Sequence, residues 1–224
     1  MSNNLFFDIE TGKAIDYEIF EPIYREPRIT KTGAIHASDK SVEDQRKECL
    51  DKCCISPFTG RVILTGTILN KDYVPYWENS DCTEKDLLNN FWQMYREAGL
   101  VIGFDIKRFD LPFLMKRSFK HKLTIPDVMD RRAKYFLDNI IDIRDQLMCG
   151  EWQGKGSLDD YSKFFGLQDK DTEVSEQFEY IWNTNKERAI KGNQIEVENI
   201  RDIYNLIVGT KPKEDNSFME GLEK

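Results

Sequence analysis

Short runs of apolar residues alternate with polar turn segments along the chain, and these runs predict the strands of a sheet. LFFDI at 5–9 is typical of a short buried strand. RVILTGTIL at 61–69 is longer and rich in β-branched residues, which favour strands. Further strands are expected at 74–77, as an edge strand, at 100–104 and at the beginning of 139–147.

Between these strands, apolar residues recur at the three- and four-residue spacing of an amphipathic helix. The clearest case is TEKDLLNNFWQMYREA at 83–98, which begins with a threonine cap and is followed by Gly99. Other helices are expected at 41–54, 111–120, 157–166 and roughly 196–208. Strands that pair early in the chain and alternate with helices later predict an α/β fold.

The chain is long enough, at 224 residues, for one domain with a proper core, and it has no Gly-, Ser- or Pro-rich linker in its middle. We therefore expect a single domain over 1–210, followed by a flexible polar tail at 211–224. Within the domain, the proline-containing segment 21–40 predicts an irregular excursion or hairpin.

The compartment follows from what the sequence lacks. No apolar run approaches the ~20 residues of a membrane helix, and the first residues do not have the basic-then-apolar order of a secretory signal. The five cysteines, an odd number, fit a reducing compartment better than a disulfide framework. We expect an intracellular protein with no membrane partner.

The net charge of −8 argues against a protein held on nucleic acid by bulk electrostatics alone. The segment 107–134 differs, because basic residues outnumber acidic ones there. They are Lys107, Arg108, Lys116, Arg117, Lys120, Lys122, Arg131, Arg132 and Lys134. Two interpretations stay open, a solvated helical face and a patch that binds a nucleic-acid backbone.

Two carboxylates, Asp8 and Glu10, end the first strand with one isoleucine between them. Residues two apart on a strand share a face, with α-carbons roughly 6.5–7 Å apart. Two such anions repel each other by about 4 kcal/mol at a separation of about 4 Å and an effective dielectric constant of 20. A proton or a cation must compensate, and ligands made of oxygen alone favour Mg²⁺ or Mn²⁺.

Two more acids, Asp110 and Asp202, occupy positions that suggest a functional role. Asp110 begins a helix directly after the strand at 100–104 and a short loop. Asp202 lies inside the last predicted helix, where aspartate is unfavourable unless it has a partner.

The segments around these acids form an ordered series. They are FDIET, SPFTGRVILTG, IGFDIKRFDLPFL, IIDIRDQL and GSLDDYSKFFGL, followed by Asp202 as the last acid. Their order, chemistry and spacing resemble the DEDD superfamily of 3′–5′ exonucleases, in the branch related to the exonuclease domain of family-B DNA polymerases. The resemblance extends over residues 5–207.

This resemblance implies a ribonuclease-H-like fold, a mixed β-sheet flanked by α-helices. It implies a 3′–5′ exonuclease that hydrolyses phosphodiester bonds from the 3′ end of single-stranded DNA, with RNA as an alternative, by a two-metal-ion mechanism. Two Mg²⁺ or Mn²⁺ ions would be held by Asp8, Glu10, Asp110 and Asp202. Any replication or repair partner stays unspecified.

The sequence departs from the family pattern at two places. Asp105 stands where the second motif usually has asparagine, which either alters a hydrogen bond or adds negative charge near the substrate phosphate. Glu198 and Val197 stand where the third motif usually has the tyrosine or histidine that orients or deprotonates the attacking water. Glu198 shares a helix face with Asp202, so we expect it to orient the water or act as general base.

Three alternatives remain at this stage. In the first, Glu198 is a solvated surface residue and metal alone places the water. In the second, the chain is a catalytically weakened nucleic-acid-binding module that retains the exonuclease fold. The third is a small-molecule phosphodiesterase, whose cleft would be too closed for a polynucleotide.

Candidate substrate contacts lie next to the predicted metal ligands. Thr11 and Gly12 directly follow the two acids of the first motif, with Thr11 expected against the 3′-terminal nucleotide. In the second motif, Lys107 and Arg108 would meet phosphate. Phe109 either stacks on a base or belongs to the core.

Overall fold

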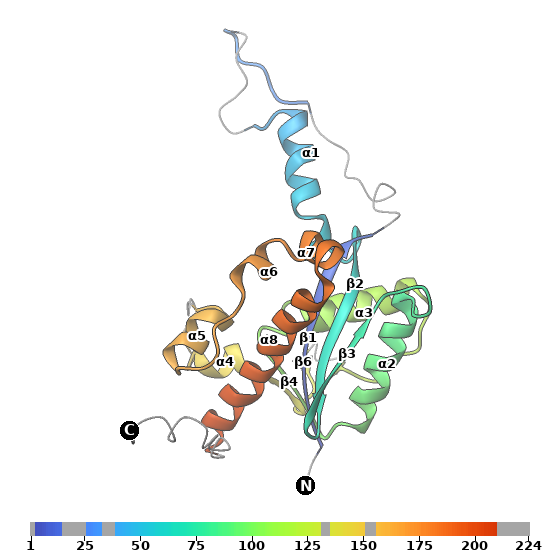
Figure 1. The fold of residues 1–224 in the computed structure, drawn as a ribbon. Helices are drawn as coiled ribbons and strands as arrows, with labels where there is room; N and C mark the ends of the chain where they lie inside the picture. Colours follow the sequence, from blue (N-terminus) through green and yellow to red (C-terminus); the bar gives the residue numbers. More distant parts are fainter. Residues whose placement is uncertain (1–2, 15–25, 33–38, 131–134, 151–155, 210–224) are drawn as a thin grey trace.

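The computed structural model describes residues 3–14, 26–32, 39–130, 135–150 and 156–209. At its centre is a five-stranded sheet with helices on both faces, and α1 projects from one end (Figure 1). The tail predicted at 211–224 and most of the excursion predicted at 21–40 lie outside the described residues.

The main sheet has the strand order β3-β2-β1-β4-β7. Its strands are β1 (Asn4–Lys13), β2 (Gly60–Leu69), β3 (Asp72–Trp77), β4 (Leu100–Gly103) and β7 (Ile140–Asp142). β2 is antiparallel to β1 and β3, whereas β4 is parallel to β1 and β7. A separate ladder joins β5 (Met129–Asp130) to β6 (Tyr135–Phe136). The α/β class and the mixed sheet flanked by helices are confirmed.

The helices are α1 (Val42–Asp51), α2 (Glu84–Glu97), α3 (Asp110–Lys120), α4 (Ile143–Leu147), α5 (Leu158–Phe164), α6 (Thr172–Glu176), α7 (Phe178–Thr184) and α8 (Lys186–Ile207). A short 3₁₀ turn spans Cys53–Ile55. Thr83 caps α2 through reciprocal hydrogen bonds with Asp86, as the sequence predicts. None of the described helices has the length and apolar character needed to cross a bilayer.

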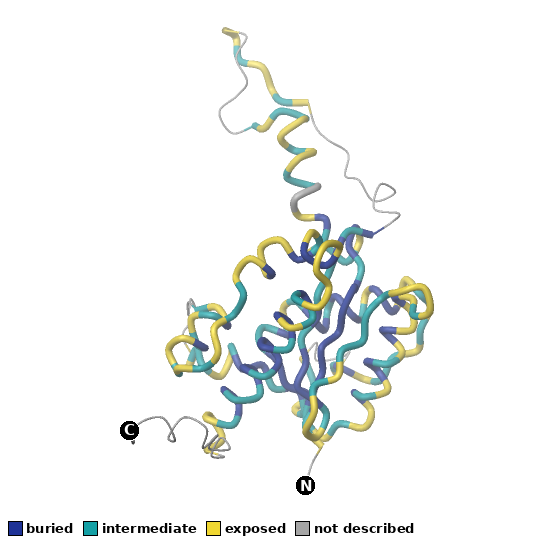
Figure 2. The backbone as a smooth tube through the Cα atoms, viewed as in Figure 1, coloured by how far each residue is buried: buried dark blue, intermediate teal, exposed yellow. Residues whose placement is uncertain are grey.

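Alternation along β1 decides which core each side chain joins. Leu5, Phe7 and Ile9 pack on the face covered by α2 and α3, whereas Phe6 packs on the opposite face beneath α8. The central strands β1, β2 and β4 form the most buried part of the molecule (Figure 2). Side chains two apart on a strand share a face, so β1 presents its even-numbered residues, the two acids included, to α8.

α8 begins ten residues before the start that the sequence predicts. Its first residues are capped by the side chain of Asn185, which accepts a hydrogen bond from the backbone N–H of Arg188 at 3.2 Å. Up to residue 194, the buried positions of this helix are small or polar, namely Ala189, Gly192 and Asn193. Apolar periodicity is therefore visible only in the second half of the helix, which is why the predicted start is late.

A buried ion pair ties the helices of one face to the sheet. The carboxylate of Glu84 on α2 accepts hydrogen bonds from Nε and Nη2 of Arg117 on α3, at 2.8 and 2.6 Å. It also accepts from the backbone N–H of Val62 on β2 and lies 2.8 Å from Nε2 of His121. The two charged side chains of the pair are only 6% and 3% exposed. Removing either partner would leave the other charge buried.

Replacing Glu84 by alanine should lower the free energy of unfolding by about 3–5 kcal/mol, because Arg117 would keep its charge without a partner. Urea denaturation measures the change. Glu48→Ala is the matched control, since Glu48 pairs with Lys40 and Lys52 at the exposed surface, and it should leave the midpoint almost unchanged. Equal effects of the two substitutions would contradict this prediction.

Candidate active site

Three carboxylates from distant parts of the chain meet between β1 and α8. One carboxylate oxygen from each of Asp8, Glu10 and Glu196 lies within 4.8 Å of the other two. Asp8 and Glu10 lie on the face of β1 that α8 covers, and Glu196 is buried on the side of α8 that packs against the sheet. We call these three residues the acid cluster.

Asp110 lies next to the acid cluster. β4 runs parallel to the first half of β1, with Ile102 beside Phe6, so the chain leaves β4 close to Asp8, and α3 begins there with Asp110. Its carboxylate is almost fully buried and accepts a hydrogen bond from the backbone N–H of Ile9 at 3.3 Å. The structure thus brings together three of the four acids predicted as metal ligands.

The carboxyl groups of this region hold protons unusually tightly. Burial, followed by the charge of Glu196, raises the pKa of Glu10 to about 8. Burial also raises the pKa of Asp110 to about 7. The pKa of Asp8 is raised well above its ordinary value by burial and then by Glu196, Asp110 and Glu10. Ionisation of these groups would therefore place more negative charge in the cluster than its surroundings compensate, and a cation would stabilise the ionised forms.

Lys170, in the segment before α6, supplies one positive charge to the cluster. Its Nζ lies 2.9 Å from Oε1 of Glu196, and the hydroxyl of Ser175 donates to the same oxygen at 3.3 Å. One ammonium group cannot balance three carboxylates. Lys170 orients Glu196 and still leaves the cluster a net acceptor of cations.

The structure does not bring Asp202 and Glu198 to the acid cluster, which differs from the sequence prediction. Asp202 lies six residues after Glu196, which on a helix means about 9 Å along the axis and about 240° around it. Its carboxylate pairs with Arg201 at 2.8 Å. Glu198 accepts a hydrogen bond from Nε2 of Gln194 at 2.8 Å. Glu196 thus stands where Asp202 was expected.

The position of the family's tyrosine moves with this acid. Four residues before Glu196 stands Gly192, not tyrosine or histidine. A Cβ at Gly192 would lie 2.9 Å from Cγ1 of Val174, because α6 packs directly against α8 there. The packing of α6 therefore excludes an aromatic side chain from this place.

The loop of the second motif is held by a buried aspartate. Asp142, the cap of α4, accepts hydrogen bonds from the backbone N–H groups of Asp105 and Lys107, at 2.9 and 3.0 Å. Asp105 has a φ of 61°, a conformation that aspartate and asparagine both tolerate. Its carboxylate pairs with Arg108 and Arg144 at 2.7 and 2.9 Å. Its negative charge is therefore matched by guanidinium groups.

Two cavities flank the acid cluster. One, of about 550 Å³, is lined by Asp8, Phe104, Asp105, Arg144, Gly156, Ser157, Leu158, Lys170 and Glu196. The other, of about 320 Å³, includes Glu10, Thr11, Ile55, Phe109, Gln177 and Tyr180 in its lining. Of the predicted substrate contacts, Thr11 and Phe109 thus share one cavity and Asp105 lines the other, whereas Gly12 is buried against Ile63.

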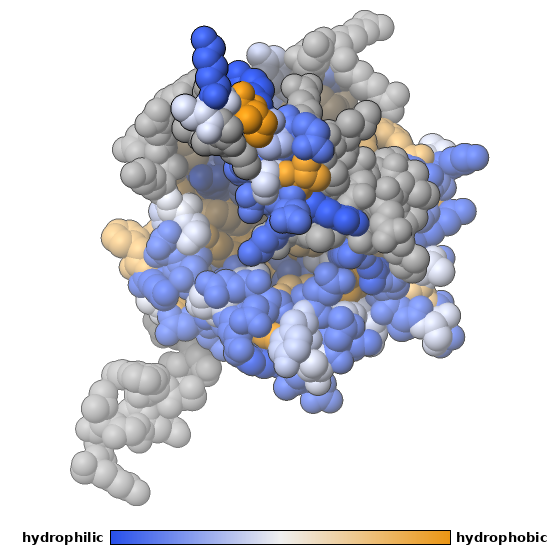
Figure 3. Space-filling view, turned by 90° about the horizontal axis from the view of Figure 1, so that it is seen from above, coloured by the Kyte–Doolittle hydropathy of each residue, from blue (hydrophilic) through white to orange (hydrophobic). Residues whose placement is uncertain are grey.

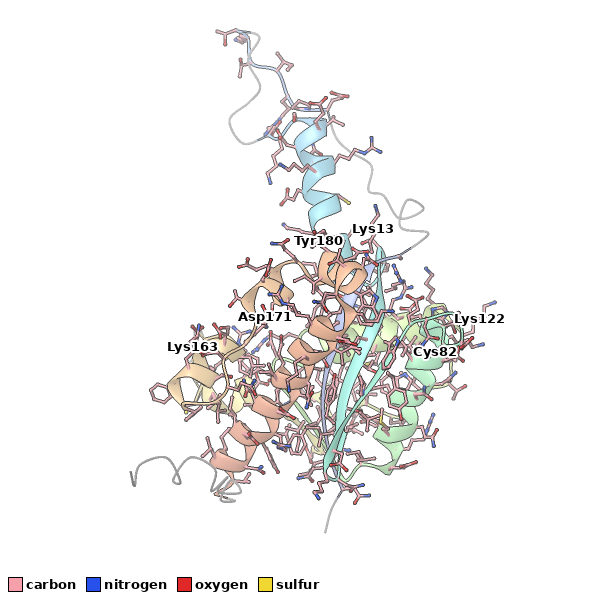
Figure 4. The ribbon with its side chains drawn as sticks, viewed as in Figure 1. Lys13, Cys82, Lys122, Lys163, Asp171 and Tyr180 are labelled. Atoms are coloured by element: carbon pink, nitrogen blue, oxygen red, sulfur yellow. The ribbon has the colours of Figure 1, made fainter. Side chains whose placement is uncertain are left out.

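The second cavity opens near the end of the molecule from which α1 projects. Tyr180 of α7 lies there near Lys13, at the end of β1 (Figure 4). Tyr180 is 65% exposed. Among the side chains drawn in colour, hydrophilic ones predominate on this end of the molecule (Figure 3). An exposed aromatic ring next to an acid cluster, on a hydrophilic surface, suits a ligand with both flat rings and polar groups.

More than half of the chain is similar to a known protein family. Residues 70–197, more than half of the chain, match the model of a family described as predicted 3′–5′ exonucleases related to the exonuclease domain of PolB. The chain belongs to this family. The matched range includes Asp110, Lys170 and Glu196 and ends before Glu198 and Asp202. None of the curated proteins compared matches the chain.

The fold of this PolB-exonuclease relative also occurs in a solved structure. The family B DNA polymerase from the hyperthermophilic archaeon Pyrobaculum calidifontis is similar, with a TM-score of 0.58 and 13% identity. The similarity covers 93% of this chain and 24% of the polymerase, so the chain spans about a quarter of that protein. At this identity the likeness concerns the fold, and it confirms the ribonuclease-H-like architecture.

The sequence analysis does not predict three residues at or next to the acid cluster, namely Lys170, Asn193 and Glu196. Glu196 and Asn193 are three residues apart, so they share a face of α8. A helix start placed at 186 would have put both on the buried face with Ala189. No comparable signal marks Lys170, which reaches the cluster from an irregular segment.

Without metal, the free energy of unfolding should fall as the pH rises from about 5 to about 8. Glu10 and Asp110 keep protons in the folded state up to about pH 8 and 7, whereas the unfolded chain has lost them above roughly pH 5. The folded state binds more protons in this window, so stability decreases with pH, by an amount on the order of a few kcal/mol. Urea denaturation in the presence of a chelator measures the slope.

Glu10→Gln is the control for this slope, because the amide does not titrate. The variant should show a smaller decrease in stability between pH 5 and 8 than the native protein. Carboxylates with a lowered pKa, such as Asp171 and Asp160, act at lower pH and do not produce this slope. A native profile that is flat, or a variant profile as steep as the native one, would contradict the assignment.

Proposed function

We propose that the chain is a metal-dependent 3′–5′ exonuclease that shortens single-stranded nucleic acid, with DNA as the first candidate and RNA as the second. The observation that carries this proposal is the acid cluster, gathered with Asp110 at one edge of the sheet and flanked by two cavities. Membership of the exonuclease family supports the reaction, and the geometry supports the residues.

The donor atoms fit a pair of hard divalent cations, Mg²⁺ or Mn²⁺. All the candidate ligands are carboxylate oxygens. The pKa values of Asp8, Glu10 and Asp110 are raised first by burial and then by neighbouring acids, and a bound cation would favour the ionised forms. The ligands that we propose are Asp8, Glu10, Asp110 and Glu196. When bound, such ions supply Lewis acidity and a water of lowered pKa at neutral pH.

The chain's own residues supply binding and orientation. Phe109 and Tyr180 offer ring faces to a terminal base, and Thr11 offers a hydroxyl in the same cavity. Lys170 and Arg144 line the other cavity, where they place positive charge for a phosphate group. The scissile bond would then lie between the two cavities, against the acid cluster.

Digestion of a 5′-labelled single-stranded oligonucleotide tests the proposal directly. The native protein should give a ladder that shortens from the 3′ end with Mg²⁺ or Mn²⁺ and no ladder with a chelator. An Asp8→Ala/Glu10→Ala double variant should be inactive. A label at the 3′ end should be released at once as mononucleotide, which distinguishes an exonuclease from an endonuclease.

Two acids of the same helix give a matched pair of variants. Glu196→Gln should lower the rate of digestion about 100-fold or more, because it removes a carboxylate from the cluster. Asp202→Asn should leave the rate near that of the native protein, because Asp202 pairs with Arg201 away from the cluster. The reverse result would return the fourth ligand to Asp202.

A native protein that binds the oligonucleotide and gives no ladder with either metal would refute the exonuclease proposal. It would support the alternative of a nucleic-acid-binding module. Gly192 at the tyrosine position is the feature that favours this second candidate, because no aromatic hydroxyl stands there to orient a water.

A further inference from the structure

Asn193 is fully buried between α8 and the sheet, and the proposed reaction does not yet use it. Its Nδ2 donates to Oδ2 of Asp8 at 2.9 Å and to Oε1 of Glu10 at 3.3 Å. A side-chain amide nitrogen carries two N–H groups. In this structure each has a different carboxylate as its acceptor, so one neutral group links the two acids of β1.

The orientation of this amide is set from its other side. Both acids must be ionised to hold a cation, and ionised carboxylates only accept hydrogen bonds, so in that state the amide nitrogen must face them and the oxygen must face away. The oxygen Oδ1 accepts a hydrogen bond from the hydroxyl of Tyr73 on β3 at 2.9 Å. Burial and the nearby acids raise the pKa of Tyr73, so its hydroxyl keeps the proton that it donates.

The sheet leaves room for Asn193 at a single glycine. Gly66 on β2 pairs with Asp8 on β1, directly beneath the amide. A Cβ at Gly66 would lie 1.7 Å from Oδ1 of Asn193, which no side chain permits. The close approach of α8 to the two acids therefore depends on Gly66.

We propose that Asn193 is a positioning residue, which holds the carboxylates of Asp8 and Glu10 in one arrangement for a divalent cation. Tyr73 sets the direction of its amide, and Gly66 gives it space. The inference rests on the proposed function in one respect, that the acid cluster binds a cation.

The chemistry of the side chain supports this role. A lysine or arginine at position 193 would also donate to both acids, but its positive charge would cancel part of the charge that attracts a cation. A neutral amide orients the oxygens and leaves their charge in place. Hydrogen-bonding partners of ligand side chains typically change metal affinity 10–100-fold when they are removed.

Calorimetric titration of the metal-free protein with Mn²⁺, without nucleic acid, tests the inference. Asn193→Ala should weaken the affinity for Mn²⁺ about 10-fold or more. Tyr73→Phe should weaken it in the same direction by a smaller factor, because the amide is then free to turn its oxygen toward the acids. The Tyr73→Phe protein retains the buried ring, so it keeps the test valid even if Asn193→Ala does not fold.

Asn199→Ala is the matched control. Asn199 is a second buried asparagine on α8, and its Nδ2 donates to Oγ of Ser162 at 3.0 Å and to the carbonyl of Gln168 at 2.8 Å. This substitution should lower the unfolding temperature and leave the affinity for Mn²⁺ unchanged. A purely structural role of Asn193 would give the same result for Asn193→Ala, and that outcome would overturn the inference.

The two proposals fail in different ways. If the native protein binds Mn²⁺ and digests no oligonucleotide, the exonuclease proposal fails, and the ranking of affinities still decides the role of Asn193. If the native protein does not bind Mn²⁺, the positioning role is overturned together with the metal site. If Asn193→Ala and Tyr73→Phe bind Mn²⁺ within about twofold of the native protein, only the positioning role is overturned.

Discussion

The close packing of α8 across β1 and β2 is the constraint on which the rest of the structure depends, because it brings like charges together. The first half of the helix places Glu196 against Asp8 and Glu10. Two ionised carboxylates about 4 Å apart repel each other by about 4 kcal/mol at an effective dielectric constant of 20. The second half buries Val197, Ile200 and Ile203 under the sheet. Each such side chain contributes about 1.5–3 kcal/mol, so the apolar half is strong enough to hold the acidic half in place.

The acid cluster differs from the neighbouring acids in how its negative charge is paired. Acids of the neighbouring loop are paired with guanidinium groups, as Asp105 is with Arg108 and Arg144. Among the described residues, the acid cluster is contacted only by hydrogen-bond donors and by the ammonium group of Lys170. Negative charge is therefore concentrated at one place, between a cavity lined by carboxylates paired with Arg144 and Lys170 and a cavity with aromatic side chains.

The sequence predicts the parts of this site that follow from local periodicity. Asp8 and Glu10 share a face because every second residue of a strand does, and Asp110 follows a parallel strand that ends beside them. Glu196 does not follow from local pattern. Before it, α8 buries Ala189 and Gly192 against an apolar cluster that includes Val174, whereas the buried Asn193 donates to the acids of β1. The role of such residues can be predicted only when both partners of the long-range contact are known.

The glycine at position 192 makes the alignment of the acids more important in this chain. α6 occupies the space of a tyrosine four residues before Glu196, with Val174 against the helix. In the exonuclease reaction that we propose, no aromatic hydroxyl would then orient the attacking water. Its position would depend on the bound cations, and therefore on the carboxylates that hold them. An amide that links Asp8 to Glu10, itself fixed by Tyr73, supplies from β3 and α8 an order that the missing aromatic group does not.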